Sequence, residues 1–269
     1  MQPGNNTIAL LGATGKTGRS VLRLLLEDGT HNLQIYVRSK QKLFGLFPQL
    51  SAASQNVKIY EGAISDLSVL ISCLSGANTA IVTLGENENL RGISILQDSA
   101  RNIVAAVEEL RRRDSSFKKL RLVYLSSSSK NERFAAARPW LANWFIQTAF
   151  YYPYQDLAKA QDILLAAPSL LSVLLVQPPV LVEEPPSGSK LSTEHVNLAC
   201  SYEDLGAAFV ELACHDQYGD LKAIGVSSKG GNASLKYTPV IVSRIVFGFL
   251  TGYVPGFWAL RQKLGLDSL

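Results

Sequence analysis

The chain has 269 residues, of which 47% are hydrophobic and 18% are charged, and its formal net charge is +4. This balance is typical of a folded globular protein with one substantial core and excludes an intrinsically disordered chain. The cysteines and histidines show no metal-ligand spacing, and the densest basic run, residues 111–113, falls where a long helix should end. We therefore predict neither a metal site nor nucleic-acid binding.

An apolar run over residues 7–11 leads into the glycine-rich turn at residues 12–18, and an amphipathic stretch follows over residues 20–27. This order predicts a buried strand, a tight turn and the start of a helix, as in a dinucleotide site. One glycine permits the sharp turn, one lets a pyrophosphate approach the backbone, and one lets the helix pack on the strand. The N–H groups at the helix start would face the phosphates. The expected binding residues are Gly12, Thr14, Gly15, Lys16, Thr17 and Gly18.

The spacing Gly-x-x-Gly-x-x-Gly after a strand resembles that of the atypical short-chain dehydrogenases, in particular the NmrA-like and isoflavone-reductase-like proteins. The resemblance implies an α/β fold, a Rossmann doubly wound parallel sheet, and bound NADP(H). It does not by itself imply redox chemistry, because similar proteins include reductases, cofactor-binding regulators and enzymes that keep NADPH as a scaffold for rearrangements. Residues 134–140 and 152–157 further resemble NAD(P)-binding proteins of fungal secondary metabolism.

The choice of cofactor depends on Arg38, which directly follows the second predicted strand at residues 33–37. In this fold an acidic side chain at that point would hydrogen-bond the ribose 2′-hydroxyl of NAD. An arginine instead offers a planar fork of donors to a 2′-phosphate. The resemblance implies that Lys16 can reach the same phosphate. We predict NADP(H) over NAD(H), with an ordinary surface charge as the alternative for Arg38.

Further cofactor contacts are expected where later segments pass the same edge of the sheet. Ile64 would cover the adenine, although Ala63 departs from the aspartate usual in similar proteins. Residues 83–85 end the fourth predicted strand and should pass the inner ribose and pyrophosphate. Residues 178–180 resemble a proline segment beside the nicotinamide. The expected contacts in these segments are Ile64, Thr83, Leu84, Gly85, Pro178 and Val180.

The fifth predicted strand, residues 120–125, ends in a run of serines. Ligands in doubly wound sheets lie beyond the carboxyl ends of the strands, so Ser126 and Ser127 would face the nicotinamide side of the cleft. One of them could polarise a substrate oxygen, and ordinary turn chemistry is the equal alternative. The aromatic-rich residues 131–153 then form either a satellite core, which we favour, or a lid over an apolar substrate.

A helix is predicted to start near Tyr154 and to carry Asp156 and Lys159. Similar short-chain dehydrogenases use Tyr-x-x-x-Lys, in which the lysine holds the ribose and lowers the tyrosine pKa. Tyr154 and Lys159 are about 140° apart on a helix, so Gln155 holds the tyrosine position if Lys159 keeps its role. Three alternatives stay open. In the first, Tyr154 lies before the helix, where the angle rule does not apply. In the second, Lys159 acts alone. In the third, Asp156 is the acid–base group rather than a helix-start carboxylate or an ion-pair partner.

Residues 1–182 are predicted to form an NADP-binding Rossmann domain, and residues 183–269 a small C-terminal substrate lobe packed on it as a single structural unit. The apolar stretch 240–258 is interrupted by glycines, a proline and an arginine. We expect it to pack on the lobe or line the substrate pocket, not to span a membrane, with interfacial attachment as the alternative. The N-terminus has no basic stretch before an apolar core, which predicts a cytoplasmic protein. We separately expect a monomer or a homodimer.

The leading functional prediction is an NADP(H)-dependent oxidoreductase acting on a bulky apolar small molecule, which the resemblance associates with natural-product biosynthesis. Lys159 and a nearby hydroxyl would assist proton delivery. The first alternative is a non-redox isomerase or semipinacol-type rearrangement enzyme that keeps NADPH as a scaffold. The second is an NADP-sensing regulatory protein that binds a partner protein and needs no catalytic group.

Overall fold

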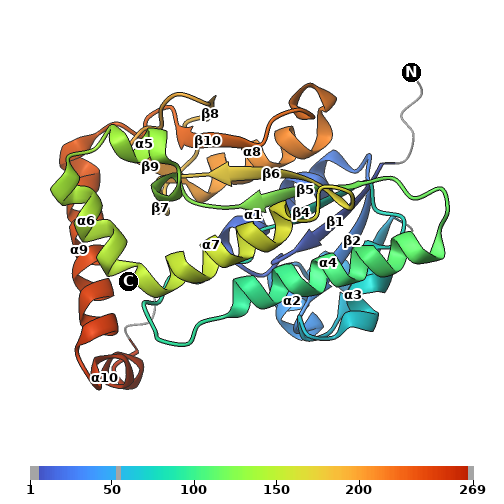
Figure 1. Ribbon diagram of the computed structural model, residues 1–269, viewed down its shortest axis with the longest axis horizontal. Helices are drawn as coiled ribbons and strands as arrows, with labels where there is room; N and C mark the ends of the chain where they lie inside the picture. The colour runs from blue at the N-terminus through green and yellow to red at the C-terminus, as the bar shows by residue number, and fades with distance from the viewer. Residues whose placement is uncertain (1–5, 53–55, 266–269) are drawn as a thin grey trace.

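The computed structural model describes residues 6–52 and 56–265, and helices alternate with strands through most of this length (Figure 1). The strands are β1 (Thr7–Leu11), β2 (Asn32–Val37), β3 (Val57–Glu61), β4 (Thr79–Val82), β5 (Leu120–Leu125), β6 (Leu171–Gln177), β7 (Val180–Val182), β8 (Ser189–Ser192), β9 (Ala199–Ser201) and β10 (Ala223–Ser228). The α-helices are α1 (Lys16–Asp28), α2 (Lys40–Leu46), α3 (Leu67–Leu74), α4 (Ile95–Arg113), α5 (Glu132–Ala136), α6 (Trp140–Ala149), α7 (Tyr151–Leu165), α8 (Tyr202–Cys214), α9 (Ser234–Tyr253) and α10 (Phe257–Lys263).

The main sheet has eight strands in the order β3-β2-β1-β4-β5-β6-β10-β8. All neighbours run parallel except β8, which is antiparallel to β10. The strand order reverses direction at β1 and β4, and the carboxyl ends of the parallel strands therefore share one edge where ligands bind in such sheets. The doubly wound parallel sheet expected from the glycine turn is confirmed.

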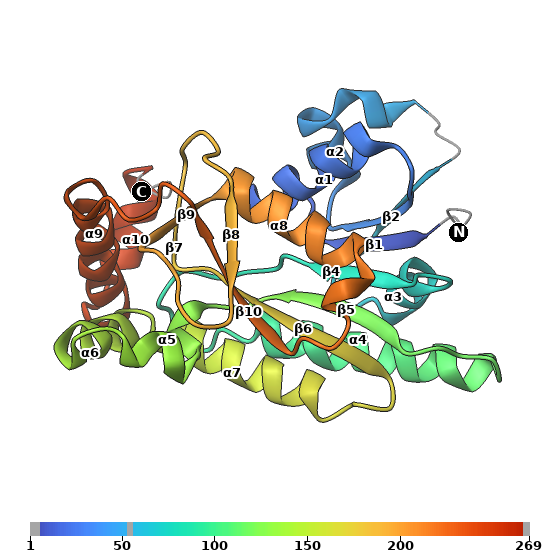
Figure 2. The same cartoon turned by 90° about the horizontal axis from the view of Figure 1, so that it is seen from above.

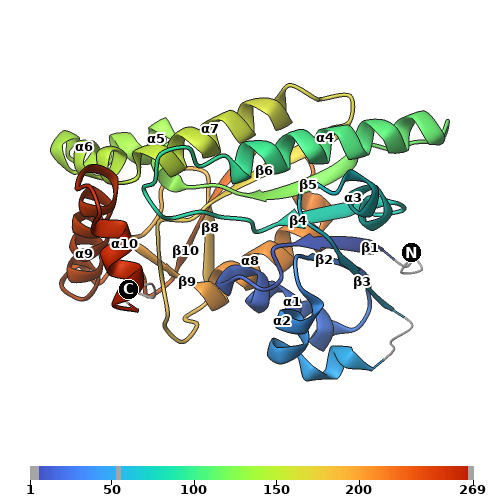
Figure 3. The same cartoon turned by 90° about the horizontal axis from the view of Figure 1, so that it is seen from below.

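Helices cover both faces of this sheet (Figures 2 and 3). Helices α1 and α8 lie on one face, and α3, α4 and α7 lie on the other. The side chains of β1 alternate between the two layers: Ile8 and Leu10 enter the first core, while Ala9 and Leu11 enter the second. Burial on both faces explains why this strand is continuously apolar in sequence.

The C-terminal part of the chain is divided between the sheet and one end of the molecule. Strands β8 and β10 complete the main sheet, and α8 packs on α1, so the division expected between residues 182 and 183 cuts through a continuous sheet. Helix α9 packs against α6 beyond the carboxyl edge of the strands, and α10 packs against α9 (Figures 1 and 2). Gly248 lets α9 approach α6 closely, because a Cβ there would lie 2.3 Å from the carbonyl oxygen of Ala149.

In the described ranges, no single helix has the length and apolar composition needed to cross a membrane. Helices α9 and α10 meet these criteria only as a pair, and they are bent against each other by 118°. The side chains of Ile241 and Ile245 in α9 instead line an internal hollow of the protein. This placement agrees with the expectation that the stretch lines a pocket.

Candidate functional site

The glycine turn has the geometry that its spacing predicts. Gly12 has a φ of +96°, and a Cβ there would lie 2.7 Å from Thr83 Oγ1. A Cβ on Gly18 would lie 2.0 Å from the carbonyl oxygen of Gly12, so no side chain fits between helix and turn. Gly15 has only a 3.4 Å neighbour, and α1 begins after it without an acidic residue in its first turn or a side-chain cap. Its first N–H groups therefore remain available to an anion.

A groove of about 850 Å³ runs from this turn along the carboxyl edge of the sheet. We call it the glycine-turn groove. Its lining includes most of the residues predicted to contact a cofactor, namely Gly12, Thr14, Gly15, Lys16, Thr17, Arg38, Ile64, Thr83, Leu84 and Gly85. Of the others, Gly18 packs under the turn, and Pro178 and Val180 line a second hollow. Most of the residues predicted to contact a cofactor thus lie together along this groove.

Two cations expected at the 2′-phosphate lie in different surroundings. Arg38 is exposed at the end of β2 and lines the groove together with Lys42, and it pairs with no carboxylate in residues 6–52 and 56–265. Lys16 instead pairs with Glu183 and lies 5.6 Å from the ring centroid of Tyr202. The hydrogen bond from Lys16 holds the pKa of Glu183 below its usual value. Because both partners are largely exposed, this ion pair is weak and a phosphate can replace it.

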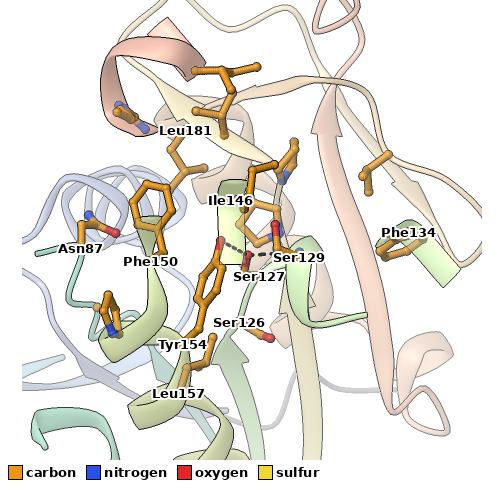
Figure 4. A pocket seen from close by; sticks show the side chains of 18 of the residues that line it. Asn87, Ser126, Ser127, Ser129, Phe134, Ile146, Phe150, Tyr154, Leu157 and Leu181 are labelled. Carbon is orange, nitrogen blue, oxygen red and sulfur yellow. Dashed lines mark hydrogen bonds between the residues drawn. The ribbon is translucent and has the colours of Figure 1, made fainter. Parts of the chain in front are cut away.

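A second hollow of about 480 Å³, which we call the serine cavity, adjoins the groove. The two share eight lining residues: Leu84, Gly85, Asn87, Leu125, Phe150, Leu181, Tyr202 and Arg244. Most of the serine cavity is lined by apolar side chains, and three of its polar residues, Ser126, Ser127 and Ser129, directly follow β5 (Figure 4). A bulky apolar molecule in this cavity would therefore lie beside whatever occupies the groove.

Tyr154 and Ser127 place two hydroxyl groups together in the serine cavity (Figure 4). The Ser127 hydroxyl donates to Tyr154 Oη at 3.5 Å and accepts from the Ser129 N–H at 3.2 Å. The Tyr154 ring lies 5.7 Å from the ring of Phe150, which helps to orient it. Ser126 also lines the cavity, but its hydroxyl accepts from Gln161 Nε2 at 2.9 Å. Ser127 is thus the serine best placed to act with Tyr154.

The register of α7 differs from the expected one. This helix begins at Tyr151, so Tyr154 lies inside it, and the alternative that Tyr154 precedes the helix is wrong. The residue one turn later on the same face is Ala158. Lys159 is exposed and lines neither the groove nor the serine cavity. The catalytic and cofactor roles expected for Lys159 therefore have no geometric support, because the helix turns it away from both hollows.

Asp156 is used inside the fold. Its carboxylate is 2% exposed and accepts from the N–H groups of Leu96 at 2.8 Å and Gln97 at 3.0 Å. These groups begin α4, whose own capping residue, Ser94, does not bind them. Asp156 thus supplies from α7 the acceptor that the start of α4 needs. The geometry favours a helix-capping carboxylate over the acid–base group.

Arg138, which was not among the predicted site residues, follows α5 and lines the serine cavity. Its guanidinium donates to Ser129 Oγ at 3.0 Å and to Ser128 Oγ at 2.9 Å. Burial lowers the pKa of Arg138, and the nearby Tyr154 opposes this shift. The sequence carries no signal for this role, because only the folding of α5 back over the serine run brings the side chain to the cavity.

The aromatic segment divides between the two predicted uses. Phe134 and Phe150 line the serine cavity. Trp144 and Phe145 instead pack against Phe249 of α9, with ring centroids 6.2 Å and 6.0 Å away. Phe134 and Phe150 are thus part of the cavity wall. The cluster on α9 is only a partly exposed counterpart of the expected satellite core, since Trp144 is 52% and Phe145 is 39% exposed.

The fold and the site together define an α/β protein with a dinucleotide groove beside an apolar cavity. The NAD(P)H-binding family model matches residues 12–216, and the chain belongs to this family. This agrees with the relationship expected from the glycine turn.

Similar proteins with curated names are fungal oxidoreductases. Oxidoreductase ordB of Dothistroma septosporum is 32% identical over 254 residues, covering 94% of this chain and 93% of its own length. Averufin oxidase A of Aspergillus flavus is 33% identical over 273 residues, covering 91% and 97%. A short-chain dehydrogenase/reductase of Veillonella parvula in complex with NADP has the same fold, with a TM-score of 0.64 and 17% identity over 84% of this chain and 96% of that one. The chain is thus an NAD(P)H-binding protein with fungal oxidoreductase relatives.

Proposed function

We propose that this protein is an NADP(H)-dependent oxidoreductase that acts on a bulky apolar small molecule in natural-product biosynthesis. The observation that carries the proposal is the shared wall of the glycine-turn groove and the serine cavity, with the Tyr154 and Ser127 hydroxyls facing the cavity. The names of the fungal relatives support the redox class and the biosynthetic context.

The residues of the groove fit a dinucleotide. The Gly12–Gly18 contact closes the turn against the helix, and the uncapped start of α1 can receive the pyrophosphate. Arg38 and Lys42 would hold a 2′-phosphate at the end of β2. Bound NADPH supplies a hydride to an electrophilic carbon of the substrate. The apolar lining of the serine cavity would exclude water from that carbon.

Reduction of a carbonyl also needs a proton at the substrate oxygen. The Tyr154 phenol would donate it, and the Ser127 hydroxyl would hydrogen-bond the same oxygen and position it. The amine that a Tyr-x-x-x-Lys pair would provide is missing, since Ala158 occupies that position on α7. We therefore assign the proton transfer to Tyr154 and the positioning to Ser127.

Isotope transfer tests the redox proposal directly. The enzyme is incubated with C4-deuterated NADPH and a panel of polycyclic aromatic ketones, and products are analysed by mass spectrometry. We expect deuterium in the product in proportion to NADPH consumed. Product formed without NADPH oxidation and without deuterium would instead establish the non-redox alternative, with the cofactor as a scaffold. Binding of NADPH with no conversion of any panel compound would favour a regulatory protein.

Replacing Arg38 with alanine is expected to weaken NADPH binding about tenfold or more and to leave NADH binding nearly unchanged. A charge-assisted bidentate contact contributes about 1.5–3 kcal/mol, and only NADPH carries the phosphate that makes it. Isothermal titration with both cofactors measures the effect. Arg112→Ala, at the exposed end of α4, is the matched control. Equal affinity of the native protein for the two cofactors would contradict the preference.

A further inference from the structure

The serine cavity contains a partly buried cation that the proposed proton transfer does not use. Arg138 reaches the cavity from the segment after α5 and is fixed there by the hydroxyls of Ser128 and Ser129. Ser128 is fully buried, so this hydrogen bond anchors the guanidinium to the protein interior. Two neutral hydroxyls position the charge without neutralising it. Removing a charge from water, even in part, is costly when its only partners are neutral, and an anionic ligand would compensate it.

The other charged groups around the cavity do not provide that compensation. The Glu86 carboxylate accepts from the N–H groups of Asn87 and Glu88 in its own loop. His195 is exposed and lies 2.8 Å from Lys190 Nζ. Arg244 lines the groove as well as the cavity, and its charge helps to lower the pKa of Glu183. In the part of the chain that the structure describes, no ion pair joins Arg138 to a carboxylate.

We propose that Arg138 is the anion-recognition residue of the serine cavity, and that the substrate is an aromatic molecule carrying an ionised acidic oxygen, a carboxylate or a phenolate. This inference rests on the proposed use of the cavity as the substrate site. Two of the five N–H donors of a guanidinium are engaged by serines, and the others remain for a ligand. A planar guanidinium fork matches two acidic oxygens, which fixes the orientation as well as the presence of the anion.

This placement also sets the direction of the substrate. Arg138 lies near Tyr154, whose ionised form would raise the pKa of the arginine. The Tyr154 hydroxyl faces the same cavity as the guanidinium. An anion held by Arg138 would therefore place the rest of the aromatic frame along the apolar wall, with its reacting carbon toward the groove.

Binding without turnover tests the inference. Isothermal titration compares 2-naphthoate, a rigid aromatic anion, with 2-naphthamide, its neutral isostere, at neutral pH on the protein saturated with NADP⁺. We expect the native protein to bind the anion about tenfold more tightly. Arg138→Gln should make the two affinities equal, and Arg138→Lys should keep a reduced preference because it retains the charge without the fork. Arg133→Gln, which removes an exposed arginine of α5 paired with Glu194, should change nothing.

Equal affinity of the native protein for the two probes would overturn the inference, as would a preference that survives Arg138→Gln. A preference lost in Arg244→Gln but kept in Arg138→Gln would also overturn it and assign the anion to Arg244. If Arg138→Gln fails to fold, judged by circular dichroism, the native comparison and Arg138→Lys decide. Because no hydride transfer is measured, failure of the proposed redox reaction leaves this test intact. Failure of this test likewise leaves the isotope experiment intact.

Discussion

Replacing Tyr154 with phenylalanine is expected to lower turnover by about 10²–10⁴-fold with little change in stability. The substitution removes only the hydroxyl that would supply the proton, and general acid catalysis contributes about that factor. The aromatic ring and its packing on Phe150 are retained. Turnover is followed by the loss of NADPH absorbance with the most active ketone of the panel, under saturating cofactor.

Two further variants make this result specific. Tyr151→Phe removes a hydroxyl from the same helix, on a side chain that is 47% exposed and lines neither hollow, and should leave turnover unchanged. Ser127→Ala should lower turnover less than Tyr154→Phe, because it removes a positioning contact and leaves the proton donor in place. A loss of less than about tenfold in Tyr154→Phe would show that the proton comes from elsewhere.

Replacing Asp156 with alanine is expected to lower the free energy of unfolding by about 2–4 kcal/mol, because two N–H groups at the start of α4 lose their acceptor in the interior. Urea denaturation followed by circular dichroism measures this loss. Asp156→Asn keeps one acceptor oxygen and should cost less. Asp162→Ala, which removes an exposed carboxylate of the same helix, is the control.

The same variants decide between the two roles considered for Asp156. If the carboxylate only caps α4, Asp156→Asn should reduce turnover no more than its loss of folded protein explains. A fall of about a hundredfold in turnover at unchanged stability would instead identify Asp156 as the acid–base group. The outcome also separates a structural defect from a chemical one, since both oxygens of Asp156 accept from N–H groups of α4 and its carboxylate lines neither hollow.

No lysine lines the serine cavity beside Tyr154 among the residues that the structure describes. A helix brings residues one turn apart to the same face, and at that position relative to Tyr154 the chain has Ala158. The cation that lines the serine cavity near Tyr154 is Arg138, which comes from a different segment. We infer that Arg138 binds an anionic group of the substrate and does not assist the proton donor, Tyr154. The Arg138 variants and the Tyr154 variants test these two roles separately.

The local sequence determined those features that depend only on residues close together in the chain. The apolar run before Gly12, the glycine spacing and Arg38 after the second strand depend on backbone conformation and on position along the chain. For that reason the doubly wound sheet and the lining of the glycine-turn groove were predictable. The serine run was also placed correctly beyond β5, because the end of a strand in a parallel sheet is itself a location.

Only the tertiary structure decided the roles that depend on contacts between distant segments. Lys159 was expected in the site because similar short-chain dehydrogenases have a lysine on this helix, but in this fold Lys159 is exposed and on another face than Tyr154. Asp156 meets α4 across a sequence separation of 60 residues, and Arg138 meets the serine run through the turn after α5. Spacing along the chain specifies a helix face or a strand end, whereas the partner of a buried charge is chosen by packing, which no local pattern contains.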